Sequence, residues 1–395
     1  LTHASRAMAA PQDPVLRDPT CDRQLRDEGY AVFPLLSDDE VAEIRSAYRT
    51  LVEDPDAPGI MEFDYMAEDR SAMRQVAELL APVWARHVPG VFTDHEPVFS
   101  TFVAKHPGPI SGMFLHDDRT YLDERRQRAF TMWVPLVDTS PELDNGTLWI
   151  VPGSHRLFNA FSGTGTPDWI RPYEDYLERY LVPLRMRAGE ELVYDTKTVH
   201  GSTPNRTSET REAIATAVAP RGADLIHVVA AEGTRRQVYR IDREFFLEVH
   251  PHSIETEGMP DRYPLIEEFD ETVLEVDPVA LAAVCDPQDV PVPRRIAAGV
   301  VPRQPEPPGE RARAAAAAGI LDGQDAGSHE PLVAAGGPGA APPDGGSPLE
   351  VDSARSPRPR RWWQRRGQHA AGGCPPSRRL ARVSRRAEVR AERQP

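Results

Sequence analysis

The pattern of apolar and polar positions changes once along the folded part of the chain. Residues 30–33 form a short apolar run that predicts a strand, and Ser37 stands three residues before Glu40, as in a helix capping box. Apolar residues then recur at helical spacing over 41–51, and again over 73–80, from a start near Ser71 to an end before Pro82. The front part therefore predicts one strand and two helices, each helix with one apolar face.

From about residue 91 to 219 the chain carries short runs rich in Val, Ile, Phe, Trp and Thr, separated by Pro, Gly, Asn and Asp. The expected strands lie at 99–104, 129–137, 147–151, 191–194 and 213–218, with a helical insertion at 169–180. A further strand at 237–241 and a short helix at 244–249 follow. Many short strands joined by turns predict a β-sandwich or barrel rather than a parallel sheet.

The last hundred or so residues have a different composition. Residues 291–395 are dominated by Pro, Ala, Gly, Arg and Ser, with no sustained period of 2 or 3.6. Such a segment cannot bury enough apolar surface to offset the entropy lost on ordering. We therefore expect a disordered N-terminus at 1–13, one folded domain at 14–290, and a disordered C-terminal tail at 291–395.

The net charge of -15 is divided unevenly. Residues 291–395 carry 18 basic and 10 acidic side chains, whereas the first 290 residues carry 28 basic and 51 acidic ones. An acidic body is a poor partner for nucleic acid or an anionic membrane, so we expect a small-molecule or carrier-bound substrate. The sequence lacks the roughly 20 apolar residues of a membrane span and any paired-cysteine motif, which favours a cytoplasmic protein.

One constellation of residues predicts a metal site. His116 and Asp118 stand two residues apart on an expected strand, so they share a face while Asp117 points away. His200 lies about eighty residues later. Two histidines and one carboxylate are the ligands of non-haem Fe(II) oxygenases, which leave positions open for a co-substrate and O₂. Arg211 follows a turn-rich loop after His200, so antiparallel pairing would bring its guanidinium back beside that histidine, where it could bind a carboxylate.

The other histidines are interpreted as structural or solvated. His155 belongs to a Pro-Gly-Ser-His turn, and the metal triad is complete without it. His250 and His252 are also two residues apart, but Pro251 lies between them and no third ligand is evident, so we expect a solvated loop there.

Four segments together resemble the phytanoyl-CoA dioxygenase family: residues 116–118, 145–155 and 200–205 with Arg211, and more weakly 27–30. The resemblance covers about residues 27–220. It implies a mainly β fold, a double-stranded β-helix (a jelly-roll, cupin-like barrel) with flanking helices and the metal at its mouth. Matched residue by residue, His116, Asp118 and His200 correspond to the iron ligands, and Arg211 to the residue that binds the distal carboxylate of 2-oxoglutarate. Further co-substrate contacts of the family fall at Ser202, Trp133 and Lys105.

The activity that the resemblance implies is a dioxygenase reaction. Fe(II) and 2-oxoglutarate would be the cofactors, O₂ would be consumed, and hydroxylation would release succinate and CO₂. A carboxylate at Asp118 favours hydroxylation, because halogenating relatives have a small residue there. Two alternatives stay open: a jelly-roll metalloenzyme that does not use 2-oxoglutarate, and a ligand-binding barrel without catalysis. The pocket is expected to be lined by residues 120–128 and 158–180.

The composition of the tail generates a prediction. A chain truncated after about residue 300 should keep the melting temperature and the Fe(II) affinity of the full chain, since the removed segment offers no core. Thermal denaturation of the two proteins checks this. A large fall in melting temperature on truncation would contradict it.

Overall fold

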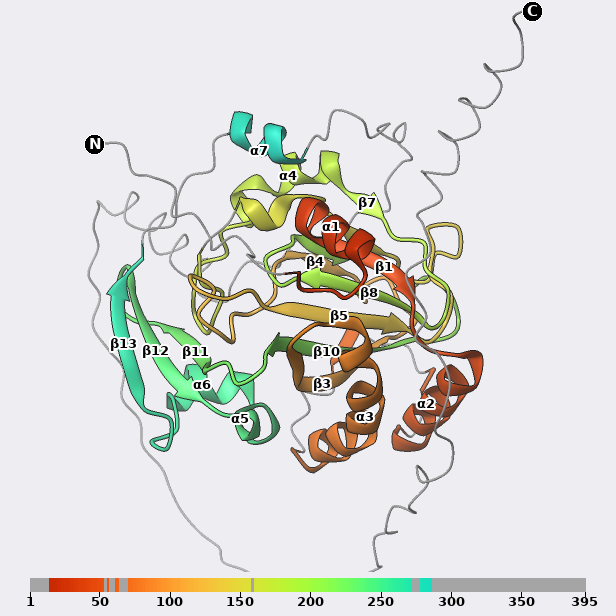
Figure 1. The fold of residues 1–395 in the computed structure, drawn as a ribbon, viewed down its shortest axis with the longest axis horizontal. Coiled ribbons are helices and arrows are strands. Elements are labelled where there is room, and N and C mark those ends of the chain that lie inside the picture. The colour runs from red at the N-terminus through yellow and green to blue at the C-terminus, as the bar shows by residue number, and fades with distance from the viewer. Residues whose placement is uncertain are drawn as a thin grey trace, which may run out of the picture. The chain divides into compact units, whose positions relative to one another are not determined.

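A computed structural model describes residues 14–52, 55–56, 61–63, 70–157, 160–271 and 278–285 of the chain. Its strands form antiparallel sheets, and helices lie around them (Figure 1). The expected mainly β fold is therefore confirmed. The segments 1–13 and 291–395, for which disorder is expected, lie outside the described residues.

The larger sheet has six strands in the order β1-β8-β5-β10-β3-β2, all paired antiparallel. Five of the six were expected from the alternation of short apolar runs and turn residues. The strands are β1 (Tyr30–Pro34), β2 (Met61–Phe63), β3 (His95–Lys105), β5 (Phe130–Pro135), β8 (Glu190–Asp195) and β10 (Arg211–Pro220).

A second sheet of four shorter strands, in the order β4-β9-β6-β7, faces the first. Side chains from both sheets meet in one core, with Trp133, Leu192 and Ala213 from the large sheet and Leu148 and Ile150 from the small one. Two facing antiparallel sheets with a shared core form the expected jelly-roll barrel. The strands are β4 (Met113–His116), β6 (Leu148–Ile150), β7 (Val182–Pro183) and β9 (His200–Ser202).

A third sheet, in the order β11-β12-β13, follows the barrel in sequence and is accompanied by two short helices. Only its middle strand and the first helix were expected. His250 caps the second helix and His252 lies within it, so the expectation of a loop at these histidines is wrong, although His252 is exposed. The elements are β11 (Leu225–Ala230), β12 (Arg235–Ile241), β13 (Leu265–Asp270), α5 (Arg243–Glu248) and α6 (Pro251–Glu257).

The helices at the front of the domain follow their capping signals. Ser37 and Glu40 form the expected capping box of α2 (Asp38–Leu51). Asp18 caps α1 (Pro19–Glu28), which ends at Gly29 in the left-handed conformation. A side chain at Gly29 would also collide with His155, whose ring lies under this turn, so His155 packs against the end of α1.

The expectation that the second helix ends before Pro82 is wrong. Helix α3 (Arg70–Val91) continues through Pro82 and Pro89. Each proline removes one backbone hydrogen bond and costs about 3 kcal/mol in a helix interior. The apolar face of α3 nevertheless continues with the buried Val83, Trp84 and Val88, and this burial offsets the cost.

Shorter helical segments complete the structure. The expected insertion at 169–180 consists of η3 (Arg171–Tyr173), α4 (Glu174–Leu177) and η4 (Glu178–Tyr180). The remaining elements are η2 (Ser154–Arg156) and α7 (Pro278–Cys285). Among the helices in the described ranges, none is long and apolar enough to cross a membrane.

One buried carboxyl group in the large sheet has no charged partner. Glu191 in β8 is fully buried, and its side-chain oxygens have no hydrogen-bond partner within the described residues. Burial raises the pKa of Glu191 well above its ordinary value, and only the backbone at Trp133 opposes this rise. The folded chain therefore keeps a proton here that the unfolded chain releases, so stability falls as the pH rises from the ordinary carboxyl pKa toward the folded one.

Replacing Glu191 by Met should therefore stabilise the fold at pH 8 by roughly 1–3 kcal/mol, the usual cost of burying an unpaired polar group. The gain should shrink toward pH 4, where the carboxyl is protonated in both states. Denaturant unfolding at the two pH values measures the difference, with the exposed Glu232→Met as control. A gain that does not depend on pH would contradict this interpretation.

Candidate active site

Two short strands bring the candidate metal ligands together. In the antiparallel pair of β4 and β9, His116 lies opposite His200, and the two ring centroids are 4.3 Å apart. Gly201 allows this approach, because a side chain there would meet the carbonyl oxygens of Met113 and Phe114 at 3.0 Å. Strand β4 ends at His116, so the third candidate, Asp118, stands in the loop that follows rather than on the strand.

The three side chains converge on one point. A carboxylate oxygen of Asp118 lies 3.7 Å from Nε2 of His200, and one donor atom from each of His116, Asp118 and His200 lies within 4.8 Å of the other two. In the described part of the chain this is the sole group of three or more such side chains with that spacing. His155, His250 and His252 are not part of it. The arrangement can hold one metal ion.

Hydrogen bonds orient each of the three groups. Nδ1 of His116 lies 2.8 Å from the carbonyl oxygen of Phe114, and Nδ1 of His200 lies 2.9 Å from that of Thr198. A carbonyl oxygen only accepts, so both Nδ1 atoms donate and both Nε2 atoms keep a lone pair for a metal. The Thr131 hydroxyl donates to the second oxygen of Asp118 at 2.6 Å.

The charge state also suits a metal. Burial, together with the neighbouring His116, lowers the pKa of His200 to about 4, although Asp118 opposes the shift. His200 is therefore neutral at pH 7, as a ligand must be. Two imidazole nitrogens and one carboxylate form a mixed donor set typical of non-haem Fe(II) sites, and no cysteine that would favour zinc belongs to it.

Arg211 is a buried cation for which the described residues supply no hydrogen-bond acceptor and no ion-pair partner. It begins β10 opposite Lys105 of β3, and only 2% of its surface is exposed. Its Nε has no hydrogen-bond partner, and its guanidinium forms no ion pair with the residues that the structure describes. Burial lowers the pKa of Arg211 to about 10, so it is still charged at pH 7. A buried charge of this kind fits a carboxylate brought by a ligand.

Trp133 and Ser202 lie beside Arg211 on the wall of the same cavity. The Arg211 guanidinium stands 5.1 Å from the centre of the Trp133 ring, which gives the cation a flat aromatic face. These two residues are therefore placed where a co-substrate bound to Arg211 would lie.

Lys105 stands behind this wall rather than on it. Its Nζ donates to the carbonyl oxygens of Ser111 and Thr203 at 2.9 and 2.8 Å and to the Ser202 hydroxyl at 2.7 Å. Burial, together with the neighbouring Arg211, lowers the pKa of Lys105 well below its ordinary value. The three acceptors match the three hydrogens that its ammonium form would donate. A side chain at Gly146 would lie only 2.0 Å from Cδ of Lys105, so the Asn-Gly turn leaves room for the lysine. Lys105 thus affects the cavity indirectly, because it holds the Ser202 hydroxyl on the cavity wall.

The cavity has a volume of about 410 Å³ and contains both the triad and Arg211. Its remaining wall is mostly apolar and includes Phe99, Tyr121, Phe245, Phe246 and Ile254. Helices α5 and α6 contribute to this wall, which the sequence analysis did not anticipate. Thr120 and Tyr121 line the cavity as expected, but no described residue of 158–180 does so. Trp169, Ile170 and Leu177 of that segment pack instead into a separate core.

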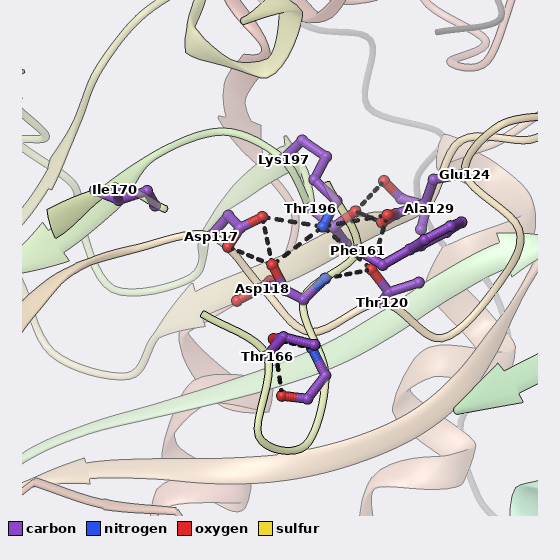
Figure 2. A network of polar contacts seen from close by, with 12 residues as sticks. Asp117, Asp118, Thr120, Glu124, Ala129, Phe161, Thr166, Ile170, Thr196 and Lys197 are labelled. Atoms are coloured by element: carbon purple, nitrogen blue, oxygen red, sulfur yellow. Dashed lines mark hydrogen bonds and ion pairs between the residues drawn. The ribbon is translucent and has the colours of Figure 1, made fainter. Parts of the chain in front are cut away.

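Asp117 points away from the triad, as expected from its place between two ligands. Its carboxylate lies 2.9 Å from Nζ of Lys197, inside a buried polar network that Figure 2 shows. Lys197 is one of two lysines in the chain, and nothing in its local sequence pattern pointed to this network.

Comparison with known proteins agrees with this geometry. The family model for phytanoyl-CoA dioxygenase matches residues 25–213. A phytanoyl-CoA dioxygenase of Arabidopsis thaliana is 27% identical over 139 residues, which cover 34% of this chain and 45% of the relative. Phytanoyl-CoA dioxygenase domain-containing protein 1 of Danio rerio is 31% identical over 120 residues, which cover 28% and 40%. The chain spans less than half the length of these relatives.

Solved structures give weaker likenesses. The non-heme alpha ketoglutarate dependent carbocyclase SnoK from nogalamycin biosynthesis is 22% identical, with a TM-score of 0.42 over 57% of this chain and 89% of that one. EctD from S. alaskensis, solved with 2-oxoglutarate and 5-hydroxyectoine, is 24% identical, with a TM-score of 0.39 over 55% and 84%. The sequence match is the stronger finding. Residues 25–213, just under half of the chain, match the phytanoyl-CoA dioxygenase family, and relatives from Arabidopsis thaliana and Oryza sativa carry that family's name.

Proposed function

We propose that this protein is a cytoplasmic Fe(II)- and 2-oxoglutarate-dependent dioxygenase that hydroxylates a small-molecule or carrier-bound substrate. The observation that carries the proposal is the shared cavity, in which three converging ligands and an unpaired buried guanidinium face the same space. A metal ion would bind the three ligands, and a dicarboxylate bound beside it would pair with the guanidinium.

Each residue has a defined part in this proposal. His116, Asp118 and His200 would hold the iron, which with 2-oxoglutarate and O₂ supplies the oxidising power and yields succinate and CO₂. The Arg211 fork would bind the far carboxylate of 2-oxoglutarate through two parallel hydrogen bonds. The Ser202 hydroxyl, held by Lys105, and the Trp133 ring would fix the rest of the co-substrate.

The apolar wall would bind the substrate and keep bulk water from the metal. Phe99, Phe245 and Phe246 stand on that side of the cavity, and Phe99 stacks on Phe246 with ring centroids 4.6 Å apart. Asp118 supports hydroxylation rather than halogenation, because its carboxylate would serve as a metal ligand where a halogenating enzyme needs room for a halide.

The two alternatives account for less of the structure. A jelly-roll metalloenzyme without 2-oxoglutarate would leave the buried Arg211 with no partner, at a cost of several kcal/mol. A binding barrel without catalysis would leave unexplained why both histidines are oriented through Nδ1 and converge with Asp118 on one point. Incubation of the Fe(II)-loaded protein with 2-oxoglutarate, O₂ and a panel of apolar small molecules, free or carrier-bound, tests the proposal. Succinate should form in step with a hydroxylated product.

The first site prediction concerns iron. His116→Ala, Asp118→Ala and His200→Ala should each abolish tight Fe(II) binding, because the described triad holds no spare ligand. Anaerobic titration with Fe(II) measures this, and the exposed His252→Ala serves as the matched control that should bind like wild type. Undiminished binding by any of the three variants would remove that residue from the site.

The second site prediction concerns the co-substrate. Arg211→Ala should keep Fe(II) but weaken 2-oxoglutarate binding by roughly 30-fold or more, since truncating one partner of a buried charge pair costs about 2–5 kcal/mol. Arg211→Lys should recover only part of the affinity, because an ammonium group lacks the planar fork. Calorimetric titration of the Fe(II) protein under anaerobic conditions measures the change. Wild-type affinity in Arg211→Ala would show that another group binds the far carboxylate.

A further inference from the structure

A second group of buried charges lies next to the candidate metal site. Nζ of Lys197 is 2.9 Å from a carboxylate oxygen of Asp117 and 3.2 Å from one of Glu124. The side chains are almost fully buried, with 1%, 6% and 4% of their surfaces exposed. We call these three residues, with the hydroxyls of Thr120 and Ser162, the Lys197 cluster. Figure 2 labels Lys197, Asp117, Glu124 and Thr120 of this cluster.

The cluster joins the two chain segments that carry the ligands. Asp117 stands between His116 and Asp118, and Lys197 stands three residues before His200. The ion pair between Lys197 and Asp117 therefore spans the gap between these segments. A backbone hydrogen bond runs parallel to it, from the amide of Asp118 to the carbonyl oxygen of Thr196 at 2.9 Å.

Hydroxyl groups complete the cluster. Ser162 donates toward both oxygens of Asp117, at 2.8 and 2.9 Å. Thr120 donates to one oxygen of Glu124 at 2.8 Å, and Thr196 donates to the other at 3.1 Å. Both carboxylates thus have hydrogen-bonded partners besides the lysine, so their positions are fixed from several sides.

Stability alone does not explain such a cluster. Moving three charges out of water costs about as much as their mutual attraction returns, and apolar replacements of similar volume are often as stable. The choice of lysine is also specific, because Lys197 is one of only two lysines in a chain rich in arginine. A compact ammonium group fits between two buried carboxylates, where a guanidinium would need more room.

We propose that Lys197 is a positioning residue for the metal site. It holds Asp117 away from the point where the ligands converge and ties the 116–118 segment to the 195–200 segment, so that His116, Asp118 and His200 meet in one geometry. Without it, the ion pair that ties the two ligand-bearing segments would be lost, and the three ligands would no longer be held in one geometry. The inference rests on the proposed function insofar as the triad binds Fe(II).

The test is a double variant that leaves the net charge unchanged. Lys197→Met with Asp117→Asn removes one positive and one negative charge, so a change in Fe(II) affinity reports position rather than a change in the local field. Loss of a residue that orients metal ligands typically weakens metal binding about 10- to 100-fold. We expect a loss in this range in an anaerobic titration with Fe(II), with the triad itself intact.

The matched control breaks a buried ion pair that contains none of the ligands. Arg236 and Glu271 are 2.9 Å apart, with 2% and 10% of their side chains exposed. Arg236→Met with Glu271→Gln also conserves net charge and should bind Fe(II) like wild type, whatever its melting temperature. Ser162→Ala keeps every charge and removes one hydroxyl donor to Asp117, so it should show a smaller loss of Fe(II) affinity. This variant replaces the Lys197 double variant if the latter does not fold.

The outcomes separate the two claims. Wild-type Fe(II) affinity in the Lys197 double variant, or in Ser162→Ala if the double variant does not fold, would overturn the positioning role. An equal loss in the Arg236 control would also overturn it, because the effect would then follow from a weakened fold. Failure of the wild-type protein to bind Fe(II) would instead overturn the proposed function.

Discussion

The pairing of β4 with β9 is the constraint on which the rest of the site depends. These two short strands set His116 opposite His200, although the residues are far apart in the sequence. The backbone also supplies the carbonyl oxygens that turn both rings, so the same local geometry fixes where the histidines stand and which nitrogen they offer. Asp118 lies two residues after the end of β4, and its carboxylate converges with the two histidines. Strand β6 pairs with β9 and contributes Leu148 and Ile150 to the core shared with the large sheet, so it connects the pair to the barrel.

The buried basic side chains around β4 and β9 differ in their hydrogen-bond partners. Arg211 has no hydrogen-bond acceptor among the described residues, as expected of a group that binds the carboxylate of a ligand. Lys105 and Lys197 are, in contrast, saturated with protein acceptors. One lysine holds Ser202 on the cavity wall, and the other holds Asp117 beside the triad. An unpaired guanidinium in a cavity, with hydrogen-bonded lysines behind the cavity wall, is what a preorganised binding site requires.

The sequence predicted those parts of the molecule that depend on local pattern. The barrel strands followed from short apolar runs between turns, and α2 from Ser37 and Glu40. The sequence identified the triad residues and Arg211, but the reasons given for their convergence were wrong. Strand β4 ends before Asp118, and β10 pairs with β3 and β5 rather than with β9, so the packing of the two sheets brings Arg211 into the cavity. Features that depend on distant contacts were not predictable. The passage of α3 through Pro82 depends on burial by other elements, and the contribution of α5 and α6 to the cavity depends on how the third sheet packs. The partners of Lys197 come from two separate segments, residues 117–124 and Ser162, which no local spacing reveals.

The central claim is that the triad and Arg211 bind iron and 2-oxoglutarate together. The most direct measurement is a titration of 2-oxoglutarate into the anaerobic Fe(II)-loaded wild-type protein, followed by visible absorption. The account predicts a metal-to-ligand charge-transfer band that grows with 2-oxoglutarate, saturates at one equivalent per chain and is not produced by succinate. Tight Fe(II) binding without such a band would contradict the account and favour a metalloenzyme that does not use 2-oxoglutarate.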